Sequence, residues 1–115
     1  MNILIIYYST NGSTKKMSRL IARGVEKADG VDALLRTVNS THNNEAEDDP
    51  VVTKQELQNC SGLIIGSPTH FGNMASPMKA FIDTTTTEWH NGTLSGKPAG
   101  VFTSTSSLHL SLIHI

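Results

Sequence analysis

The sequence predicts an α/β fold in which helices cover both faces of a doubly wound parallel sheet. Short apolar segments alternate with segments of helical periodicity, which is typical of parallel sheets with right-handed crossovers. The apolar segments at residues 3–8 and 62–66 lack polar alternation, as expected for central strands buried on both faces. Loops rich in Ser, Thr, Gly and Asn follow three of the predicted strands, which favours ligand binding at the carboxyl edge of the sheet.

Length, charge and cysteine content restrict the class of protein. A chain of 115 residues suits one domain. The net charge of −1 and the lack of a basic patch disfavour a nucleic-acid partner. No apolar stretch approaches the length of a membrane span, and the apolar run at residues 3–8 is too short for a signal peptide. The single cysteine, Cys60, excludes an internal disulfide. These features predict a cytoplasmic protein.

The first strand, at residues 3–8, leads through a hydroxyl-rich turn into a predicted helix over residues 14–28. Such a junction directs backbone N–H groups and the positive end of a helix at one point, which suits a phosphate. The sequence has neither the triphosphatase loop nor the Gly-x-Gly-x-x-Gly dinucleotide motif. The same Ser and Thr side chains are equally typical of helix capping, so both interpretations stay open at this point.

The second strand is predicted over residues 31–38, and a polar, acidic surface loop follows over residues 39–50. Thr53 and Glu56 have the spacing of a capping box, which predicts a short helix that ends at about Asn59. A third strand is then expected at residues 62–66.

The loop predicted after the third strand covers residues 67–77. Ser76 is expected as an N-cap and Pro77 as the first helical residue. The inward side of this helix is predicted to carry Met78, Phe81 and Ile82. A run of four threonines then disfavours further helix.

A fourth strand is predicted at residues 98–103, followed by a hydroxyl-rich loop at residues 104–107. If the strand order is 2-1-3-4, the first and third strands flank the point where the order switches, where ligands bind in such sheets. The loops after the first, third and fourth strands then converge on one place.

These loops resemble those of the flavodoxin-like NAD(P)H:quinone oxidoreductases of the WrbA type. Residues 7–14, 66–74, 95–98 and 101–105 carry the resemblance together with Trp89, and residues 68–74 are its most specific part. The resemblance extends in order from residue 1 to residue 109. It implies a flavodoxin-like sheet with a bound FMN.

The resemblance also implies the site residues. The FMN phosphate would be held by Ser9, Thr10, Asn11, Gly12, Ser13 and Thr14. The flavin ring would lie between two further groups, which are Pro68, Thr69, His70, Phe71 and Gly72 on one side and Ser104, Thr105, Ser106 and Ser107 on the other. Asn11 and Trp89 would face the substrate, which reverses the interpretation of Trp89 as a plug under a loop.

The activity that the resemblance implies is two-electron reduction of a quinone by NAD(P)H, with hydride passing through flavin N5. No side chain is assigned a catalytic role and no metal site is expected. The full-length family implies a homotetramer. Two alternatives stay open, which are an electron-transfer flavodoxin and a non-functional fragment of the oxidoreductase.

The end of the chain departs from the family pattern. A glycine-rich stretch is expected after His109, but residues 110–115 form a short apolar tail. The sequence therefore predicts an incomplete flavodoxin-like domain at residues 1–109 and a non-family tail at residues 110–115. In this prediction the fifth strand and the last helices are missing, which leaves the fourth strand as an open edge.

Overall fold

The computed structural model describes residues 1–9, 12–38, 49–70, 73–85, 91–92 and 95–104 of the chain. Its sheet is formed by β1 (Asn2–Tyr7), β2 (Asp32–Thr37), β3 (Gly62–His70) and β5 (Ala99–Ser104). These strands lie in the order β2-β1-β3-β5, and each pair of neighbours is parallel. Because β5 is the fourth parallel strand along the chain, the predicted order 2-1-3-4 is confirmed.

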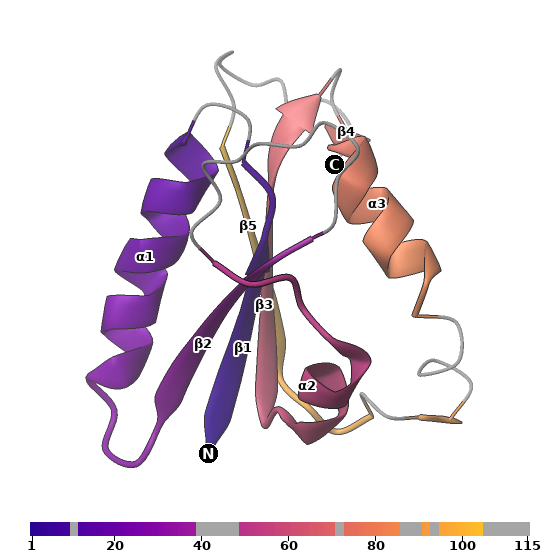
Figure 1. Ribbon diagram of the computed structural model, residues 1–115. Coiled ribbons are helices and arrows are strands. Elements are labelled where there is room, and N and C mark those ends of the chain that lie inside the picture. Colours follow the sequence, from indigo (N-terminus) through magenta and orange to yellow (C-terminus); the bar gives the residue numbers. More distant parts are fainter. Residues whose placement is uncertain (10–11, 39–48, 71–72, 86–90, 93–94, 105–115) are drawn as a thin grey trace.

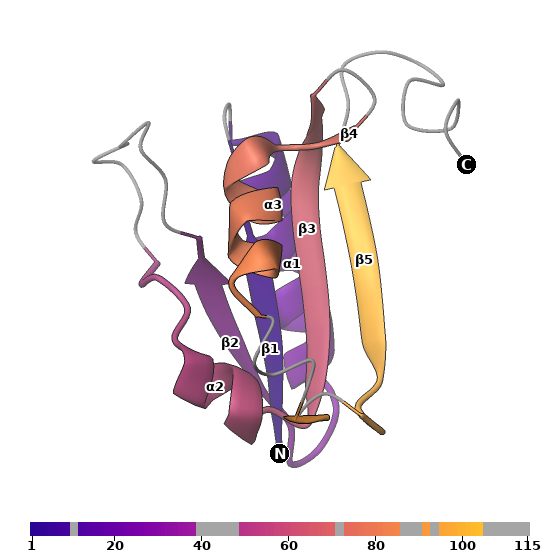
Figure 2. The same ribbon diagram turned by 90° about the vertical axis from the view of Figure 1, so that its right-hand side faces the viewer.

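Helices cover both faces of this sheet, as predicted. Helix α1 (Ser13–Glu26) lies on one face, whereas α2 (Lys54–Asn59) and α3 (Ser76–Asp83) lie on the other (Figure 1). Figure 2 looks onto the sheet with α3 in front of the strands and α1 behind them. None of the helices in the described residues is long and apolar enough to cross a membrane.

The side chains of β1 alternate between the two layers. Leu4 and Ile6 belong to the apolar core on the side of α2 and α3, together with Leu57 and Met78. Tyr7 points to the opposite side, toward α1, because successive side chains of a strand alternate in direction, and it is fully buried. Strand β1 is therefore covered on both faces, which explains its lack of polar alternation.

The capping box at the start of α2 is confirmed. The Thr53 hydroxyl accepts a hydrogen bond from the Glu56 N–H at 3.2 Å, and the Glu56 carboxylate accepts one from the Thr53 N–H at 3.0 Å. Arg36 of β2 donates to the other Glu56 oxygen at 2.7 Å. The short helix is thus fixed at its start by its own residues and tied to the neighbouring strand.

The prediction of a loop at residues 67–77 is wrong in its first part. Strand β3 continues to His70, and β4 (Asn73–Met74) pairs with its end in the antiparallel direction. The physical reason is tertiary pairing, because β5 stays in register with β3 as far as Pro68 and Ser104. This pairing outweighs the turn preference of Pro68.

The predicted N-cap of α3 is also wrong by one residue. Ala75 occupies the N-cap position, and Ser76 is the first residue of the helix. The cause is a hydrogen bond at 2.9 Å from the Ala75 N–H to the buried hydroxyl of Ser67, which fixes the chain before the helix begins. Met78 is buried, and Phe81 and Ile82 pack against the core, as predicted.

The two edges of the sheet differ in their cover. Beyond β2, a parallel bridge joins Thr37 to Val51. On the other edge, the described residues place no strand beyond β5, and the Val101 side chain is 86% exposed. Val101 is therefore an unusually exposed apolar residue on a strand.

Candidate functional site

Most of the described candidate residues lie at one edge of the sheet. Strands β1, β3 and β5 are parallel, so their carboxyl ends point the same way, toward the top of Figure 1, where α1 also begins. This edge therefore brings together Ser9, Gly12, Ser104 and the end of β3 at residues 68–70. The predicted convergence of the first, third and fourth strand ends is confirmed for these residues.

The junction between β1 and α1 is built around Gly12. The buried hydroxyl of Ser9 accepts a hydrogen bond from the Gly12 N–H at 2.9 Å. Gly12 is the N-cap of α1 and has φ +91°, in the left-handed region that favours glycine. A Cβ at Gly12 would meet no atom within 4 Å, so backbone conformation and not space explains the glycine.

The start of α1 has donors but no cap from its N-cap residue. Gly12 has no side chain to accept from the first turn, and the first helical hydrogen bond runs from the Lys16 N–H to the Gly12 carbonyl at 2.9 Å. The N–H groups of Ser13 and Thr14 precede that bond and have no acceptor within the helix. Of the two interpretations left open by the sequence, the described residues favour an anion site over a self-capped helix.

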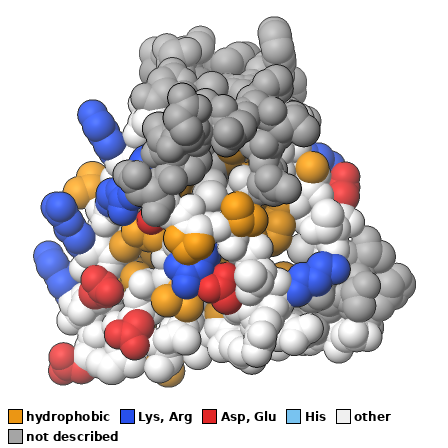
Figure 3. Space-filling model, in the orientation of Figure 1, with side chains coloured by type: hydrophobic (Ala, Val, Ile, Leu, Met, Phe, Trp, Pro, Cys, Tyr) orange, Lys and Arg blue, Asp and Glu red, His pale blue; other side chains and the backbone are white. Residues whose placement is uncertain are grey.

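The charge around this helix start also suits an anion. The first turn of α1 has no acidic residue, and it carries Lys15 and Lys16. Figure 3 shows Lys and Arg side chains along the edge of the molecule that α1 occupies. These cations add to the positive end of the helix dipole, so a phosphate at the start of α1 would be stabilised.

A close contact between β3 and β5 holds together two of the strands that end at this edge. A Cβ at Gly66 would lie 2.1 Å from the ring of Phe102, so only glycine lets this ring lie against the backbone of β3. The Gly66 carbonyl accepts a hydrogen bond from the Tyr8 N–H at 3.2 Å, directly before the β1–α1 junction. No local pattern in the sequence indicates this pair, since the two residues are far apart in the chain.

Hydrogen bonds also hold the ends of β3 and β5 in place. The Thr103 hydroxyl donates to the Ser67 carbonyl at 2.7 Å. Pro68, Thr69 and His70 are strand residues, and Ser104 is the last residue of β5 and not the start of a loop, which corrects the prediction. Parallel pairing of Ser104 with Pro68 extends the strand to this position.

Several predicted site residues lie outside the described residues. They are Thr10, Asn11, Phe71, Gly72, Trp89, Thr105, Ser106 and Ser107. Their roles stay predictions.

Two hollows lie away from the carboxyl edge. One of about 370 Å³ is lined by residues of α3 and of the segment that leads into α2, among them Val51, Val52 and Phe81. Another of about 300 Å³ is lined by Ile3, Val25 and residues of β3 and β5. Neither contains a predicted site residue. In the described part of the chain, no three His, Cys, Asp or Glu side chains form a group that could hold a metal.

Comparison with known proteins identifies the family. The family model described as NADPH-dependent FMN reductase matches residues 1–114. The chain belongs to the NADPH-dependent FMN reductase family. A flavin-binding family fits the start of α1, where the N-cap residue Gly12 has no side chain, since FMN carries a phosphate.

Among curated relatives of this reductase family, two proteins named NAD(P)H dehydrogenase (quinone) are each 38% identical over 122 residues. They come from Geobacter sulfurreducens and Solidesulfovibrio magneticus. Each alignment covers 95% of this chain but 60% of the relative, so the chain spans about three fifths of the length of these relatives.

Solved structures show the same fold. A flavodoxin, WrbA-like protein from Agrobacterium tumefaciens has a TM-score of 0.77 and 25% identity, and the match covers 97% of this chain and 64% of that one. A flavodoxin from the domain Archaea has a TM-score of 0.62 at 19% identity, covering 98% of this chain and 90% of that one. The predicted flavodoxin-like fold and the resemblance to WrbA-type proteins are confirmed.

Proposed function

We propose that this member of the FMN reductase family binds FMN and uses it to reduce quinones with electrons from NAD(P)H. The observation that carries the proposal is the start of α1 at the left-handed Gly12, which offers no side chain as a cap, at the carboxyl edge of a flavodoxin-like sheet. The names of the relatives that are 38% identical support the quinone as the electron acceptor.

The residues at the β1–α1 junction fit the phosphate of FMN. The N–H groups of Ser13 and Thr14 would donate to it, and Ser9 would hold Gly12 in the required conformation. In the proposal Thr10 and Asn11 complete this loop. Residues 68–70 at the end of β3, together with Phe71 and Gly72, would lie on one side of the flavin ring and residues 104–107 on the other. Asn11 and Trp89 would face the substrate.

When bound, FMN supplies the two-electron chemistry, because its ring can accept a hydride from NAD(P)H and return two electrons to a quinone. The protein would bind the cofactor, orient its ring and exclude water. None of these tasks needs an acidic or basic side chain at the ring, so the absence of a predicted general base fits the proposal. Backbone N–H groups close to the ring would stabilise negative charge on it.

The test begins with parallel titrations of the 115-residue chain with FMN and with riboflavin, followed by flavin fluorescence. The result that supports a phosphate site at α1 is saturable quenching of the flavin fluorescence with one FMN per chain. Saturation should need a much lower concentration of FMN than of riboflavin. Equal affinity for the two flavins would contradict it.

Activity is measured next, as NADH or NADPH oxidation by the FMN-loaded protein with and without benzoquinone. Quinone-dependent turnover supports the oxidoreductase. FMN binding without turnover would instead support an electron-transfer flavodoxin. A protein that binds no flavin would support a non-functional fragment. The homotetramer that the resemblance implies for the full-length protein stays a prediction, and so does the cytoplasmic location.

A further inference from the structure

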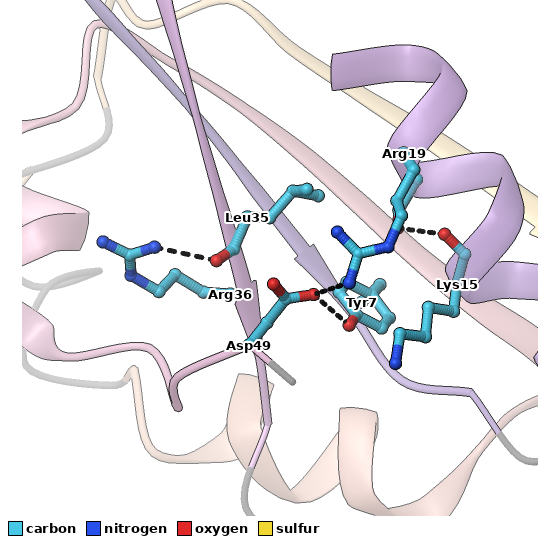
Figure 4. A network of polar contacts seen from close by, with 7 residues as sticks. Tyr7, Lys15, Arg19, Leu35, Arg36 and Asp49 are labelled. Atoms are coloured by element: carbon cyan, nitrogen blue, oxygen red, sulfur yellow. Dashed lines mark hydrogen bonds and ion pairs between the residues drawn. The ribbon is translucent and has the colours of Figure 1, made fainter. Parts of the chain in front are cut away.

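One carboxylate oxygen is shared by strand β1 and helix α1. The Tyr7 hydroxyl and the Arg19 guanidinium both donate to Oδ2 of Asp49, and the Arg19 Nη2 to Oδ2 distance is 3.2 Å. Figure 4 shows the two side chains reaching this oxygen from different elements. Asp49 itself belongs to neither element, since it lies 42 residues after Tyr7. We name these three residues the Asp49 clamp.

The clamp holds both flanks of the β1–α1 junction. Tyr7 is the last residue of β1 and comes two residues before Ser9. Arg19 belongs to α1, which begins directly after Gly12. The strand that enters the junction and the helix that leaves it are therefore attached to one atom from a third segment.

The third segment is itself held in place. The Thr37 N–H donates to the Pro50 carbonyl at 2.9 Å, and the Val52 N–H donates to the Thr37 carbonyl at 2.9 Å. These bonds fasten the chain directly after Asp49 to the end of β2. Through Asp49, the β1–α1 junction is therefore connected to a segment that is hydrogen-bonded to the sheet.

Burial makes the Tyr7–Asp49 bond of the clamp stronger than a surface ion pair. Tyr7 is fully buried, and the Asp49 side chain is 13% exposed. Hydrogen bonds to a charged acceptor are about twice as strong as neutral ones, and burial shields the bond between Tyr7 and Asp49 from water. The Arg19 side chain is 40% exposed, so its ion pair with Asp49 is less shielded than this bond. The exposed pair of Lys79 and Asp83 on α3, with side chains 59% and 63% exposed, has no such shielding.

We propose that Asp49 is a positioning residue that sets the distance between the end of β1 and the start of α1. Through this distance it determines how Ser9, Gly12 and the first N–H groups of α1 are placed for the FMN phosphate. The inference rests on the proposed function, but Asp49 does not touch the phosphate. A carboxylate that acted only as a general stabiliser of the fold would not distinguish flavins with and without a phosphate.

The experiment compares dissociation constants for FMN and riboflavin in Asp49→Asn, Tyr7→Phe and the matched control Asp83→Asn. Asp49→Asn keeps the shape of the side chain and an acceptor for Tyr7 but removes the charge that Arg19 binds. We expect FMN binding to weaken about tenfold in Asp49→Asn and about threefold in Tyr7→Phe, as the loss of one charged or one buried hydrogen bond implies. Riboflavin binding should stay as in the wild type, and Asp83→Asn should change neither constant.

Other outcomes overturn the inference. These are equal weakening for both flavins, unchanged FMN binding, or tighter FMN binding after removal of the Asp49 charge. If Asp49→Asn does not fold, the ratio of the FMN and riboflavin dissociation constants in Tyr7→Phe decides.

Failure of the proposed function would be recognised separately, because wild-type protein would then bind FMN no more tightly than riboflavin. Amide hydrogen exchange of the flavin-free protein then tests the clamp. Faster exchange at Gly12, Ser13 and Thr14 in Asp49→Asn than in Asp83→Asn supports it, whereas equal exchange in the two variants overturns it.

Discussion

Helices α1 and α2 begin in opposite ways within the same small domain. At the start of α2, Thr53 and Glu56 satisfy each other's backbone N–H groups. At the start of α1, the N-cap is Gly12, and the hydroxyl of Ser9 binds the Gly12 N–H and not the first turn. The donors of one helix start are used internally, and those of the other point to the carboxyl edge of the sheet.

This difference is what the proposed phosphate site requires, because N–H groups that are already bonded to a cap cannot also bind an anion. A Ser, Thr or Asp side chain at the N-cap competes with any external anion for the same N–H groups. Glycine at this position removes the competitor and permits the left-handed backbone. A single substitution at Gly12 therefore tests this interpretation.

The largest effect is expected from Gly12→Asp, which puts a carboxylate where the phosphate would bind. We expect FMN binding to weaken about a hundredfold, since repulsion between close charges in a partly shielded site amounts to a few kcal/mol. Isothermal titration with FMN measures the change. Gly12→Asn is the matched control, because both residues tolerate a positive φ but only Asp adds charge. Similar losses in the two variants would show that backbone conformation, and not charge, decides binding.

The next effect concerns stability and not binding. Thr53→Ala removes the cap of α2 and should lower the free energy of unfolding by about 1 kcal/mol, as measured by urea denaturation. FMN affinity should not change, because α2 packs near the opposite end of the sheet from the carboxyl edge (Figure 1). A parallel loss of FMN affinity would mean that the two helix starts are energetically coupled.

The smallest effect is a pH dependence at the same cap. Burial alone would raise the pKa of Glu56, but hydrogen bonds from Arg36 and from the Thr53 N–H outweigh it and hold this pKa below its usual value of 4.5. A lowered pKa in the folded state means that ionised Glu56 stabilises the fold above about pH 4.5, and that this contribution is lost as the pH falls further. Urea denaturation at several acidic pH values should therefore show a shallower loss of stability in Glu56→Gln than in the wild type.

Arg36→Gln tests the cause of that lowered pKa. This variant should reduce the acid sensitivity in the same direction as Glu56→Gln, because it removes the donor to the Glu56 carboxylate. An unchanged pH profile in both variants would contradict the assignment.

Local patterns in the sequence predicted much of the fold. The unbroken apolar run of β1, the capping box at Thr53 and the inward position of Met78 each depend on a few neighbouring residues, and each is confirmed. The parallel order followed from the alternation of elements. The extent of β3 could not be predicted, because it depends on pairing of Pro68 with Ser104 and of Thr69 with Met74, which are not local.

The site was predictable to a different degree. Ser9 and Gly12 lie within a single strand-to-helix junction, so their type and order indicated an anion site. The support beneath them comes from residues distant in the chain, such as Phe102 against Gly66 and Asp49 beside Tyr7. No spacing rule connects such pairs, and only the register of the strands brings them together.

The hydrogen bonds of Thr37 have a consequence for how such a protein can change over evolution. Its N–H and carbonyl bind Pro50 and Val52, so the chain that leaves β2 and the chain that returns meet at one residue. Because the closing point is fixed, lengthening the intervening segment costs little, about 0.6 kcal/mol for each doubling of its length. This position is therefore a natural insertion point, where a binding element could be added while the sheet and the β1–α1 junction stay unchanged.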